Sequence, residues 1–317
     1  MIKLAKSNFY SKKFDSVKGN LKKTWALIND LRGKVKHNIK ASFKINGQLV
    51  KDRRKISEEF NTYFSSVAKK LNEKINSKTR SSTLIGGSAH NDNCDFLSYL
   101  RKNKNKVNKC IYLSPTTPSE LHEIIQKFEN DKASDVSIKI LKKCFNYISG
   151  HLSCFFNQFM LAGTFPDILK VGKITPIFKK GDPQLFENYR PVSVIPIFGK
   201  LFEKLIYHRL YDFFTAMNVI YDKQFGFRKN HSTTHAINYS INHILKEIEA
   251  KKHVLGVFID LSKAFDTIDH NIMLDKLEHY GIRGIAKHLI SSYLKGRYQY
   301  TCFGGENQTN ITKSAYR

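Results

Sequence analysis

Residues 254–269 read VLGVFIDLSKAFDTID, and no other stretch of the chain says as much about it. It opens with a short apolar run, Val254 to Ile259, that is rich in β-branched and aromatic side chains and ends at the carboxylate of Asp260. Such a run is typical of a strand that is buried on both faces. We therefore expect Asp260 to stand at the carboxyl end of a buried strand.

A carboxylate at that position is costly to bury alone. Mg²⁺ takes oxygen ligands and is one of the few partners that removes this cost. The pattern therefore motivates a metal hypothesis for Asp260. The spacing by itself also allows two other roles: an Asp260 that is solvated at the strand end, or one that caps the following turn.

Several motifs accompany this stretch in a fixed order. IFKKGD, NYRPVSV and QFGFRKNHSTTHAI precede it, at residues 177–182, 188–194 and 224–237, and LEHYGIRG and SSYLKGRYQY follow it, at residues 277–284 and 291–300. Together with FIDLSKAFDTIDH they resemble the fingers and palm of reverse transcriptases, most closely those of non-LTR retrotransposons. The resemblance runs from about Pro115 to the C-terminus, and an ordered set is far more specific than any single motif.

The resemblance implies a mixed α/β (α+β) fold. Right-hand polymerase fingers and a partial palm would follow a mostly helical basic segment. The implied activity is RNA-directed DNA synthesis, in which two metal ions, Mg²⁺ or else Mn²⁺, support nucleotidyl transfer from dNTPs to a primer 3′-hydroxyl. The implied partners are an RNA template, a DNA primer and dNTPs.

The resemblance also assigns roles around the central stretch. Asp260 corresponds to the first catalytic metal ligand, and Leu261 would offer only its backbone carbonyl to the nucleotide. Phe265 corresponds to the bulky residue that disfavours a 2′-hydroxyl by steric clash, whereas the competing interpretation is a plain core Phe. We expect Asp266 to be a structural acceptor and Asp269 to be a helix N-cap.

Cationic side chains are needed to hold the triphosphate while its α-phosphorus is attacked. Lys179, Lys180 and Arg190 are the candidates, and Arg190 is the strongest because a planar guanidinium makes bidentate contacts to phosphate. The alternative is a surface hairpin with ordinary basic residues. Gly226 and Arg228 resemble residues that position template or primer near the palm.

Two later signatures of the family, a Pro-Gln-Gly segment and a paired aspartate, do not occur in this sequence. One carboxylate cannot hold two divalent cations, so we expect this chain to polymerise poorly or not at all by itself. It resembles an N-terminal piece of a longer polyprotein, without the endonuclease of such elements. Two other hypotheses stay open: a non-catalytic nucleic-acid-binding product of a truncated or decayed element, and a reading frame that does not fold.

Charge is the second signal in the sequence. The formal net charge is +26, and 26 of the 53 basic residues but only 8 of the 27 acidic ones precede Ile111. Basic clusters at Lys22–Lys23, Lys51–Lys55 and Arg101–Lys109 can neutralise phosphates and produce salt-sensitive, sequence-independent binding. Solvated helix faces and attraction to anionic lipid are the alternatives, and we favour nucleic acid.

Periodicity outlines the organisation. We expect two parts, residues 1–95 as a basic helical segment with a flexible linker from about Asn76, and residues 96–317 as fingers and partial palm. The pattern predicts a hairpin over residues 42–52, strands over 174–178 and 192–195, and helices over 18–32, about 56–75, after Thr117, over 145–161, after Pro196, after Ser232 and after Asp269.

The same composition excludes several protein classes. The five cysteines show no close pairs, so they support neither a disulfide framework nor a zinc knuckle. No apolar run is long enough to cross a bilayer, and the N-terminus lacks the apolar region of a secretory signal. We therefore expect an intracellular protein without a membrane anchor, present in the nucleus and cytoplasm and not secreted.

Overall fold

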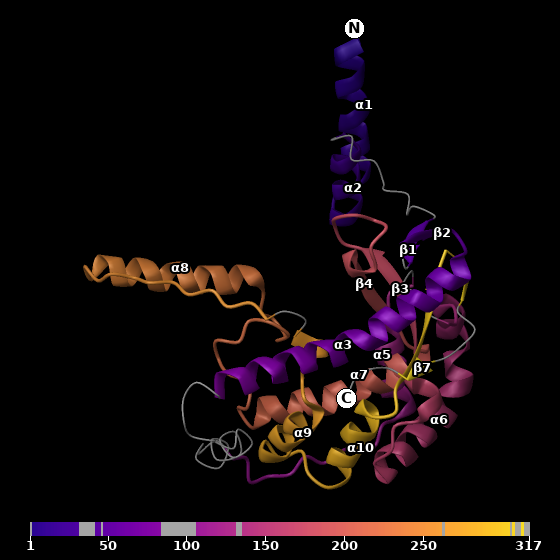
Figure 1. The fold of residues 1–317 in the computed structure, drawn as a ribbon. Helices are drawn as coiled ribbons and strands as arrows, with labels where there is room; N and C mark the ends of the chain where they lie inside the picture. The colour runs from indigo at the N-terminus through magenta and orange to yellow at the C-terminus, as the bar shows by residue number, and fades with distance from the viewer. Residues whose placement is uncertain are drawn as a thin grey trace. The chain divides into compact units, whose positions relative to one another are not determined.

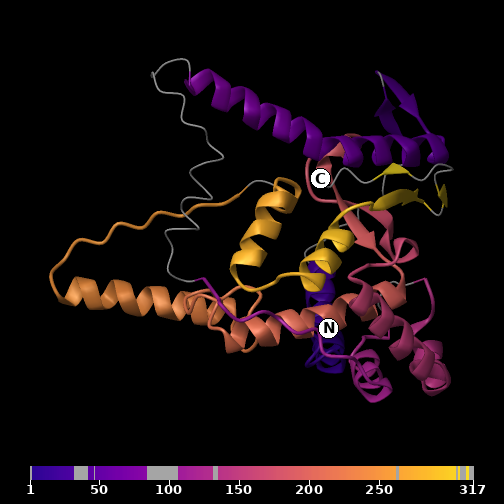
Figure 2. The same ribbon diagram turned by 90° about the horizontal axis from the view of Figure 1, so that it is seen from below.

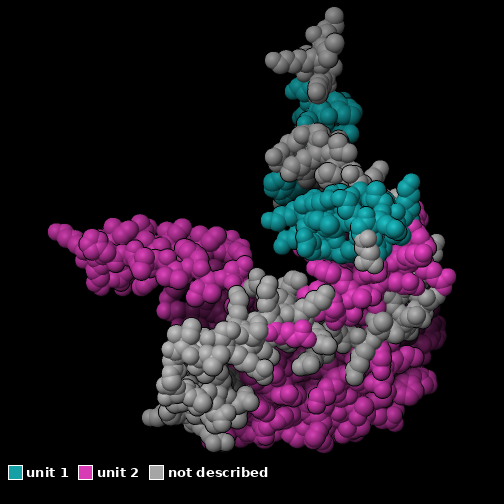
Figure 3. All heavy atoms as spheres, in the orientation of Figure 1, with its two compact units in different colours: residues 1–51, 178–188 teal, residues 52–177, 189–317 magenta. Residues whose placement is uncertain are grey.

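The computed structural model describes residues 2–31, 42–45, 47–83, 106–130, 135–261, 264–304, 306–307 and 312–313. The chain forms two compact units, residues 1–51 with 178–188 and residues 52–177 with 189–317 (Figure 3). The expected division at residue 95 lies outside the described residues.

Unit 1 contains helices α1 (Ile2–Ser16) and α2 (Leu21–Leu31) and strands β1 (Phe43–Ile45) and β2 (Gln48–Val50). β1 and β2 are antiparallel, and Gly47 turns between them with a φ of +82°. The predicted hairpin is therefore confirmed, although Asn46 lies outside the described residues. Phe43 is fully buried, with its ring centroid 5.2 Å from that of Phe186.

Unit 2 contains most of the chain (Figure 3). Its helices are α3 (Arg53–Thr83), α5 (Pro118–Gln126), α6 (Ile138–Ala162), α7 (Ile197–Ala216), α8 (Thr233–Glu249), α9 (His270–His279) and α10 (Ile285–Leu294). It also has short 3₁₀ turns η1 (Asp167–Lys170) and η3 (Ala264–Asp266), whereas the 3₁₀ turn η2 (Phe186–Asn188) belongs to unit 1. Its strands are β3 (Val171–Phe178, whose last residue belongs to unit 1), β4 (Tyr189–Val194), β5 (Tyr298–Phe303), β6 (Glu306–Asn307) and β7 (Thr312–Lys313).

The sheet of unit 2 has the order β4-β3-β5-β6, and β7 also pairs with β5. β3 and β5 are parallel, with Val171 opposite Tyr298 and Lys173 opposite Tyr300. Both strands predicted for the fingers are therefore present. The helices of unit 2 together with this small sheet give the mixed α/β character that the sequence predicts.

Helix α3 covers one face of this sheet, and it lies beside the sheet in both ribbon views (Figures 1 and 2). The Asn61 side-chain oxygen accepts hydrogen bonds from Gln299 Nε2 at 3.1 Å and from Thr301 Oγ1 at 3.2 Å. Phe60 is fully buried, and its ring packs edge-on against Tyr189 at 5.0 Å. The aromatic stripe of this helix is therefore core, as its helical spacing predicts.

The main hydrophobic core lies among α5, α6, α7, α9 and α10. Phe202 of α7 is fully buried and stacks on Phe156 and Phe165, with centroids 4.6 and 5.2 Å away. Burial of a large aromatic side chain is among the largest single contributions to a core. The apolar spacing after Pro196 therefore marks the centre of the fold.

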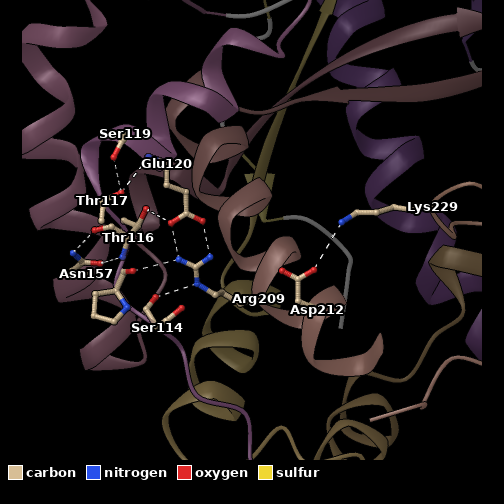
Figure 4. Close-up of polar contacts among 10 residues, drawn as sticks. Ser114, Thr116, Thr117, Ser119, Glu120, Asn157, Arg209, Asp212 and Lys229 are labelled. Atoms are coloured by element: carbon tan, nitrogen blue, oxygen red, sulfur yellow. Dashed lines mark hydrogen bonds and ion pairs between the residues drawn. The ribbon is translucent and has the colours of Figure 1, made fainter. Parts of the chain in front are cut away.

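A polar network fastens α5 to α7 beside this core (Figure 4). Arg209 donates from Nη1 and Nη2 to the two oxygens of Glu120, at 2.6 and 2.7 Å. Thr116 donates its backbone N–H to Asn157 Oδ1 at 2.7 Å, which joins the same turn to α6. The hydrogen bonds from Arg209 lower the pKa of Glu120, so this carboxyl is ionised at neutral pH.

Three predicted helix starts are confirmed. Thr117 caps α5 by accepting from the Glu120 N–H, and Ser232 caps α8 by accepting from the His235 N–H. Asp269 caps α9 by accepting from the N–H groups of Asn271 and Ile272, at 2.7 and 3.2 Å. Short polar side chains at these sites satisfy amides that have no partner inside the helix.

Three predictions are wrong in detail. The flexible linker does not begin at Asn76, because α3 continues to Thr83; no glycine or proline interrupts the helix before Gly86. The helix predicted from residue 145 begins already at Ile138. The buried strand over residues 254–259 is absent, for reasons given below. None of the described helices has the length and apolarity that a membrane crossing requires.

Candidate functional site

The stretch that leads to Asp260 is extended and exposed. No strand forms over residues 254–259, and Phe258 and Ile259 are 99% and 84% exposed. A buried strand needs hydrogen-bonded neighbours and a covering layer, and no described strand pairs with this segment. The prediction of a buried strand is therefore wrong for this structure, because composition identifies a β-prone run without supplying its partners.

Helix α8, which leads into this segment, is exposed as well. It has no buried residue. Its apolar face is exposed along its whole length, at Ile237, Ile241, Ile244, Leu245 and Ile248. The predicted helix and its apolar face are correct, but in the described part of the chain nothing covers that face.

Asp260 is exposed and forms no hydrogen bond or ion pair with another described residue. Leu261 beside it is also exposed. The side chain of Asp266 lies outside the described set, so its predicted acceptor role is untested. Asp260 is thus a solvated carboxylate in this structure, available to a cation but not driven to one by burial.

Phe265 lies in the 3₁₀ turn η3 and is 74% exposed. Within the described residues it is therefore not part of a packed core. Its ring meets the ring of Phe227 edge-on, with centroids 6.5 Å apart. The structure therefore brings the predicted sugar-screening residue next to the loop that carries Gly226 and Arg228.

That loop is organised by Arg228. Its Nη1 donates to the carbonyl oxygens of Tyr221 and Asp222, at 3.3 and 3.0 Å. Nη2 lies 3.7 Å from the Asp222 carboxylate. Arg228 thus has a structural role in addition to its predicted contact with template or primer. Gly226 has no atom near the position of an added Cβ, so crowding does not require glycine there.

Arg190 lies on β4 and is exposed, without a hydrogen bond or ion pair to any described residue. A free guanidinium fits the predicted phosphate contact. Lys179 and Lys180 are also exposed and lie in unit 1, in the turn that follows β3. Gly181 shapes this turn: its φ is +93°, and an added Cβ would lie 2.7 Å from the Asn188 side-chain nitrogen.

The described residues do not assemble a metal centre. No group of three or more His, Cys, Asp or Glu side chains is close enough within them to hold an ion. Asp269 is engaged as a helix cap, and Asp275 and Glu278 both pair with Lys287. Two-metal catalysis needs several converging carboxylates. The described residues therefore do not fit a two-metal site, and Asp260 is one free ligand at most.

Residues 177–314 match the protein family described as reverse transcriptase (RNA-dependent DNA polymerase). These residues form a reverse transcriptase domain of the non-LTR retrotransposon type. All the candidate site residues of the sequence analysis lie inside this reverse transcriptase domain.

Relatives of the reverse transcriptase come from Drosophila melanogaster mobile elements. The probable RNA-directed DNA polymerase from transposon BS is 34% identical over 46% of this chain and 16% of the relative. The RNA-directed DNA polymerase from mobile element jockey is 32% identical over 52% and 18%, and the probable enzyme from transposon X-element is 27% identical over 63% and 23%. The aligned part of the chain thus spans about a fifth of the length of these relatives.

Sequence reasoning missed one feature near Arg190. The face of the sheet that α3 leaves uncovered carries Lys173, Tyr298 and Tyr300 together, because β3 and β5 are parallel and in register. The alternation of side chains in each strand was a usable signal. The pairing of two strands more than 120 residues apart was not, since nothing local encodes it.

Proposed function

We propose that this chain supplies the fingers and the first palm carboxylate of an RNA-directed DNA polymerase that copies an RNA template from a DNA primer with dNTPs. In this proposal Arg190, Lys179 and Lys180 hold the triphosphate, Phe265 screens the sugar, and the backbone carbonyl of Leu261 faces the nucleotide. Gly226 and Arg228 contribute to positioning the template or primer.

The observation that carries the proposal is a contrast in burial inside the matched domain. The apolar positions of α7 and α10 are packed, whereas Arg190, Asp260 and Phe265, to which the resemblance assigns substrates, are all exposed. Groups that must meet a nucleotide have to be open to solvent before it binds. A purely structural Arg or Phe gains nothing from that position.

Asp260 would be one oxygen ligand of Mg²⁺ or Mn²⁺. Together with a second ion, a divalent ion held there would neutralise charge on the nucleotide and activate the primer hydroxyl. The described residues provide a single free carboxylate, so the remaining ligands must come from elsewhere. We accordingly propose that this chain alone has little or no polymerase activity. Action in the nucleus, as part of a larger intracellular element protein, belongs to the same proposal.

The second candidate function is nucleic-acid binding without chemistry. The net charge of +26 favours it directly, since a strongly basic chain binds phosphates with high salt sensitivity. The two functions differ in their dependence on dNTPs. A binding module is indifferent to the incoming nucleotide, whereas a polymerase fingers region grips the template and primer more tightly when the complementary dNTP is present.

The test measures binding to a fluorescent DNA primer annealed to an RNA template with an unpaired 5′ extension, with Mg²⁺ present. We expect the complementary dNTP, and not a mismatched one, to tighten binding. Arg190→Ala should remove this tightening, and Arg190→Lys should restore only part of it because the bidentate fork is lost. Lys143→Ala, which removes an exposed cation of α6, is the matched control and should keep the dNTP effect.

Two outcomes count against the proposal. If complementary and mismatched dNTPs have the same effect, the chain is only a binding module. Primer extension on the same substrate checks the metal argument: we expect background synthesis both from the unmodified chain and from Asp260→Asn. Efficient synthesis that Asp260→Asn abolishes would contradict the claim that one carboxylate is too few.

A further inference from the structure

We propose that the uncovered face of the β4-β3-β5 sheet binds an unpaired nucleic-acid strand, with one base entering a cavity beside Tyr300. This inference rests on the proposed function, because it names how the polymerase region would hold a single strand next to Arg190. It assigns a binding role to Lys173, Tyr298 and Tyr300.

The alternation of burial defines the two faces of the sheet. Along β3 the side of Gly172 and Ile174 is buried, whereas Lys173 is half-buried and Thr175 is exposed. Along β5 the buried positions are Gln299, Thr301 and Phe303, and the intervening positions are not buried. The buried side is the one on which Asn61 and Ser57 of α3 make their hydrogen bonds. The opposite side is therefore the free one.

The pairing register concentrates aromatic and cationic groups on the free side. Tyr298 lies opposite Val171 and Tyr300 lies opposite Lys173, so the two tyrosines stand two residues apart on one face with the lysine beside them. Tyr298 is 41% exposed. Within the described residues the Lys173 ammonium has no hydrogen bond or ion pair, which leaves it available to a phosphate.

The face is hollowed by a cavity of about 340 Å³. Polar and apolar side chains both line it: Asp135, Val171, Lys173, Thr175, Val194, Ile195, Pro196 and Tyr300. Asp135 is held in place because its Oδ1 accepts a 2.8 Å hydrogen bond from the Ile197 N–H at the start of α7. A planar base with polar edges matches a cavity that offers both apolar surface and a few polar groups.

Arg190 links this cavity to the nucleotide residues. It stands four positions before Val194 on β4, and positions separated by an even number share a face of a strand. The free face therefore runs from the cavity toward Arg190. Stacking on aromatic rings together with cations along the backbone is the general way in which proteins hold single strands.

Charge decides between a nucleic acid and a protein segment as the occupant. Lys173 and Arg190 on this face are positive and without described partners, whereas the Asp135 carboxylate that lines the cavity already accepts a hydrogen bond from the Ile197 N–H. A polyanion neutralises both, and its bases cover the tyrosines. An apolar protein segment would bury these cations at a net cost.

The first test is photocrosslinking of the whole chain. A 15-nucleotide uridine-rich RNA with one 5-iodouridine is irradiated with the protein, and the crosslinked peptides are identified by mass spectrometry. We expect crosslinks at Tyr298 or Tyr300. Crosslinks confined to other segments, such as the basic residues before Ile111, would overturn the proposal.

The second test measures the affinity of the same RNA, without iodine and without dNTPs, by fluorescence anisotropy. Tyr300→Ala should weaken binding about tenfold, whereas Tyr300→Phe should keep affinity within about twofold, because stacking needs the ring and not the hydroxyl. Tyr147→Ala, which removes an exposed tyrosine of α6, is the matched control and should have no effect. Equal losses in Tyr147→Ala and Tyr300→Ala would overturn the assignment.

Lys173 gives an independent measurement. Lys173→Gln should reduce the slope of log affinity against log salt by about 1, the value for one phosphate contact. Lys143→Gln removes one exposed charge elsewhere and should leave the slope nearly unchanged. All these measurements omit dNTPs, so they separate this proposal from the proposed function. If the complementary dNTP fails to tighten primer–template binding but RNA binding still depends on Tyr300, the polymerase role is rejected and the binding role of the sheet face stands.

Discussion

Two regions of unit 2 that both carry apolar faces differ in whether those faces are buried. The helices around Phe202 bury their apolar faces against one another, whereas α8 and the segment from Val254 to Ile259 expose theirs. This difference shows that an apolar pattern specifies which face of an element can be buried. Burial itself also requires another surface that packs against that face. The packed region has that second surface within the described chain, and the exposed region does not.

The largest expected contrast compares one phenylalanine from each region. Phe202→Ala leaves a cavity between Phe156 and Phe165 and should lower the free energy of unfolding by about 3–5 kcal/mol. Phe258→Ala removes a side chain that is 99% exposed and should change it by less than about 0.5 kcal/mol. Urea unfolding followed by circular dichroism measures both. A large loss in Phe258→Ala would mean that the exposed region is packed after all.

The polar network of the packed region gives the next effect. Arg209→Met removes two donors from the partly buried Glu120 carboxylate, leaving the one from Thr116 Oγ1, and should cost about 1–3 kcal/mol at pH 7. The surface pair of Glu278 and Lys287 is the matched control, and Glu278→Gln should cost less than about 1 kcal/mol. Equal losses in the two variants would show that burial adds nothing to the Glu120–Arg209 pair.

The pH dependence of this network has a defined sign. Because Arg209 lowers the pKa of Glu120 in the folded state, the stabilisation is present above the unfolded-state pKa of about 4.3 and is lost as the pH falls through the folded-state value. Glu120→Gln should therefore destabilise the chain at pH 7 and make little difference in strong acid. A deficit that is independent of pH would indicate a packing defect instead of a lost charge.

Glu203 sharpens the comparison because its shift is opposite. Burial raises its pKa, although Tyr293 Oη donates a 2.7 Å hydrogen bond to its Oε1. The stability that the neutral Glu203 carboxyl allows is fully present below the unfolded-state pKa, and the free energy of unfolding falls as the pH rises through the folded-state pKa. Glu203→Gln should therefore make the chain more stable at pH 7 than the unmodified protein, with a gain that shrinks in acid. Destabilisation at pH 7 would show that the carboxylate itself is needed.

Local sequence signals predict the fold wherever the determining contact is local. Thr117, Ser232 and Asp269 cap helices at the expected positions, and Gly163 ends α6 in a left-handed conformation with a φ of +63°. The strand before Asp260 fails because its neighbours in a sheet are distant in sequence. Periodicity says that such a segment prefers to be buried, and says nothing about whether a partner is present.

The candidate site divides along the same line. The resemblance predicts roles for Arg190, Asp260 and Phe265, and the structure leaves all three exposed. The Phe265–Phe227 contact and the structural hydrogen bonds of Arg228 could not be read from the sequence, because they depend on how two loops meet. Tyr298, Tyr300 and Lys173 share the free face of the sheet because β3 and β5 are parallel, and only the folded sheet reveals this register.

Amide hydrogen exchange of the whole chain, followed by mass spectrometry of its peptides, tests the central claim most directly. Amides over residues 254–261 are extended and unpaired, so we predict that they exchange within seconds, while α7 and β3 stay protected for far longer. Protection of residues 254–261 equal to that of β3 would contradict the account. It would show that the chain, without any partner, forms a buried, hydrogen-bonded strand that ends at Asp260.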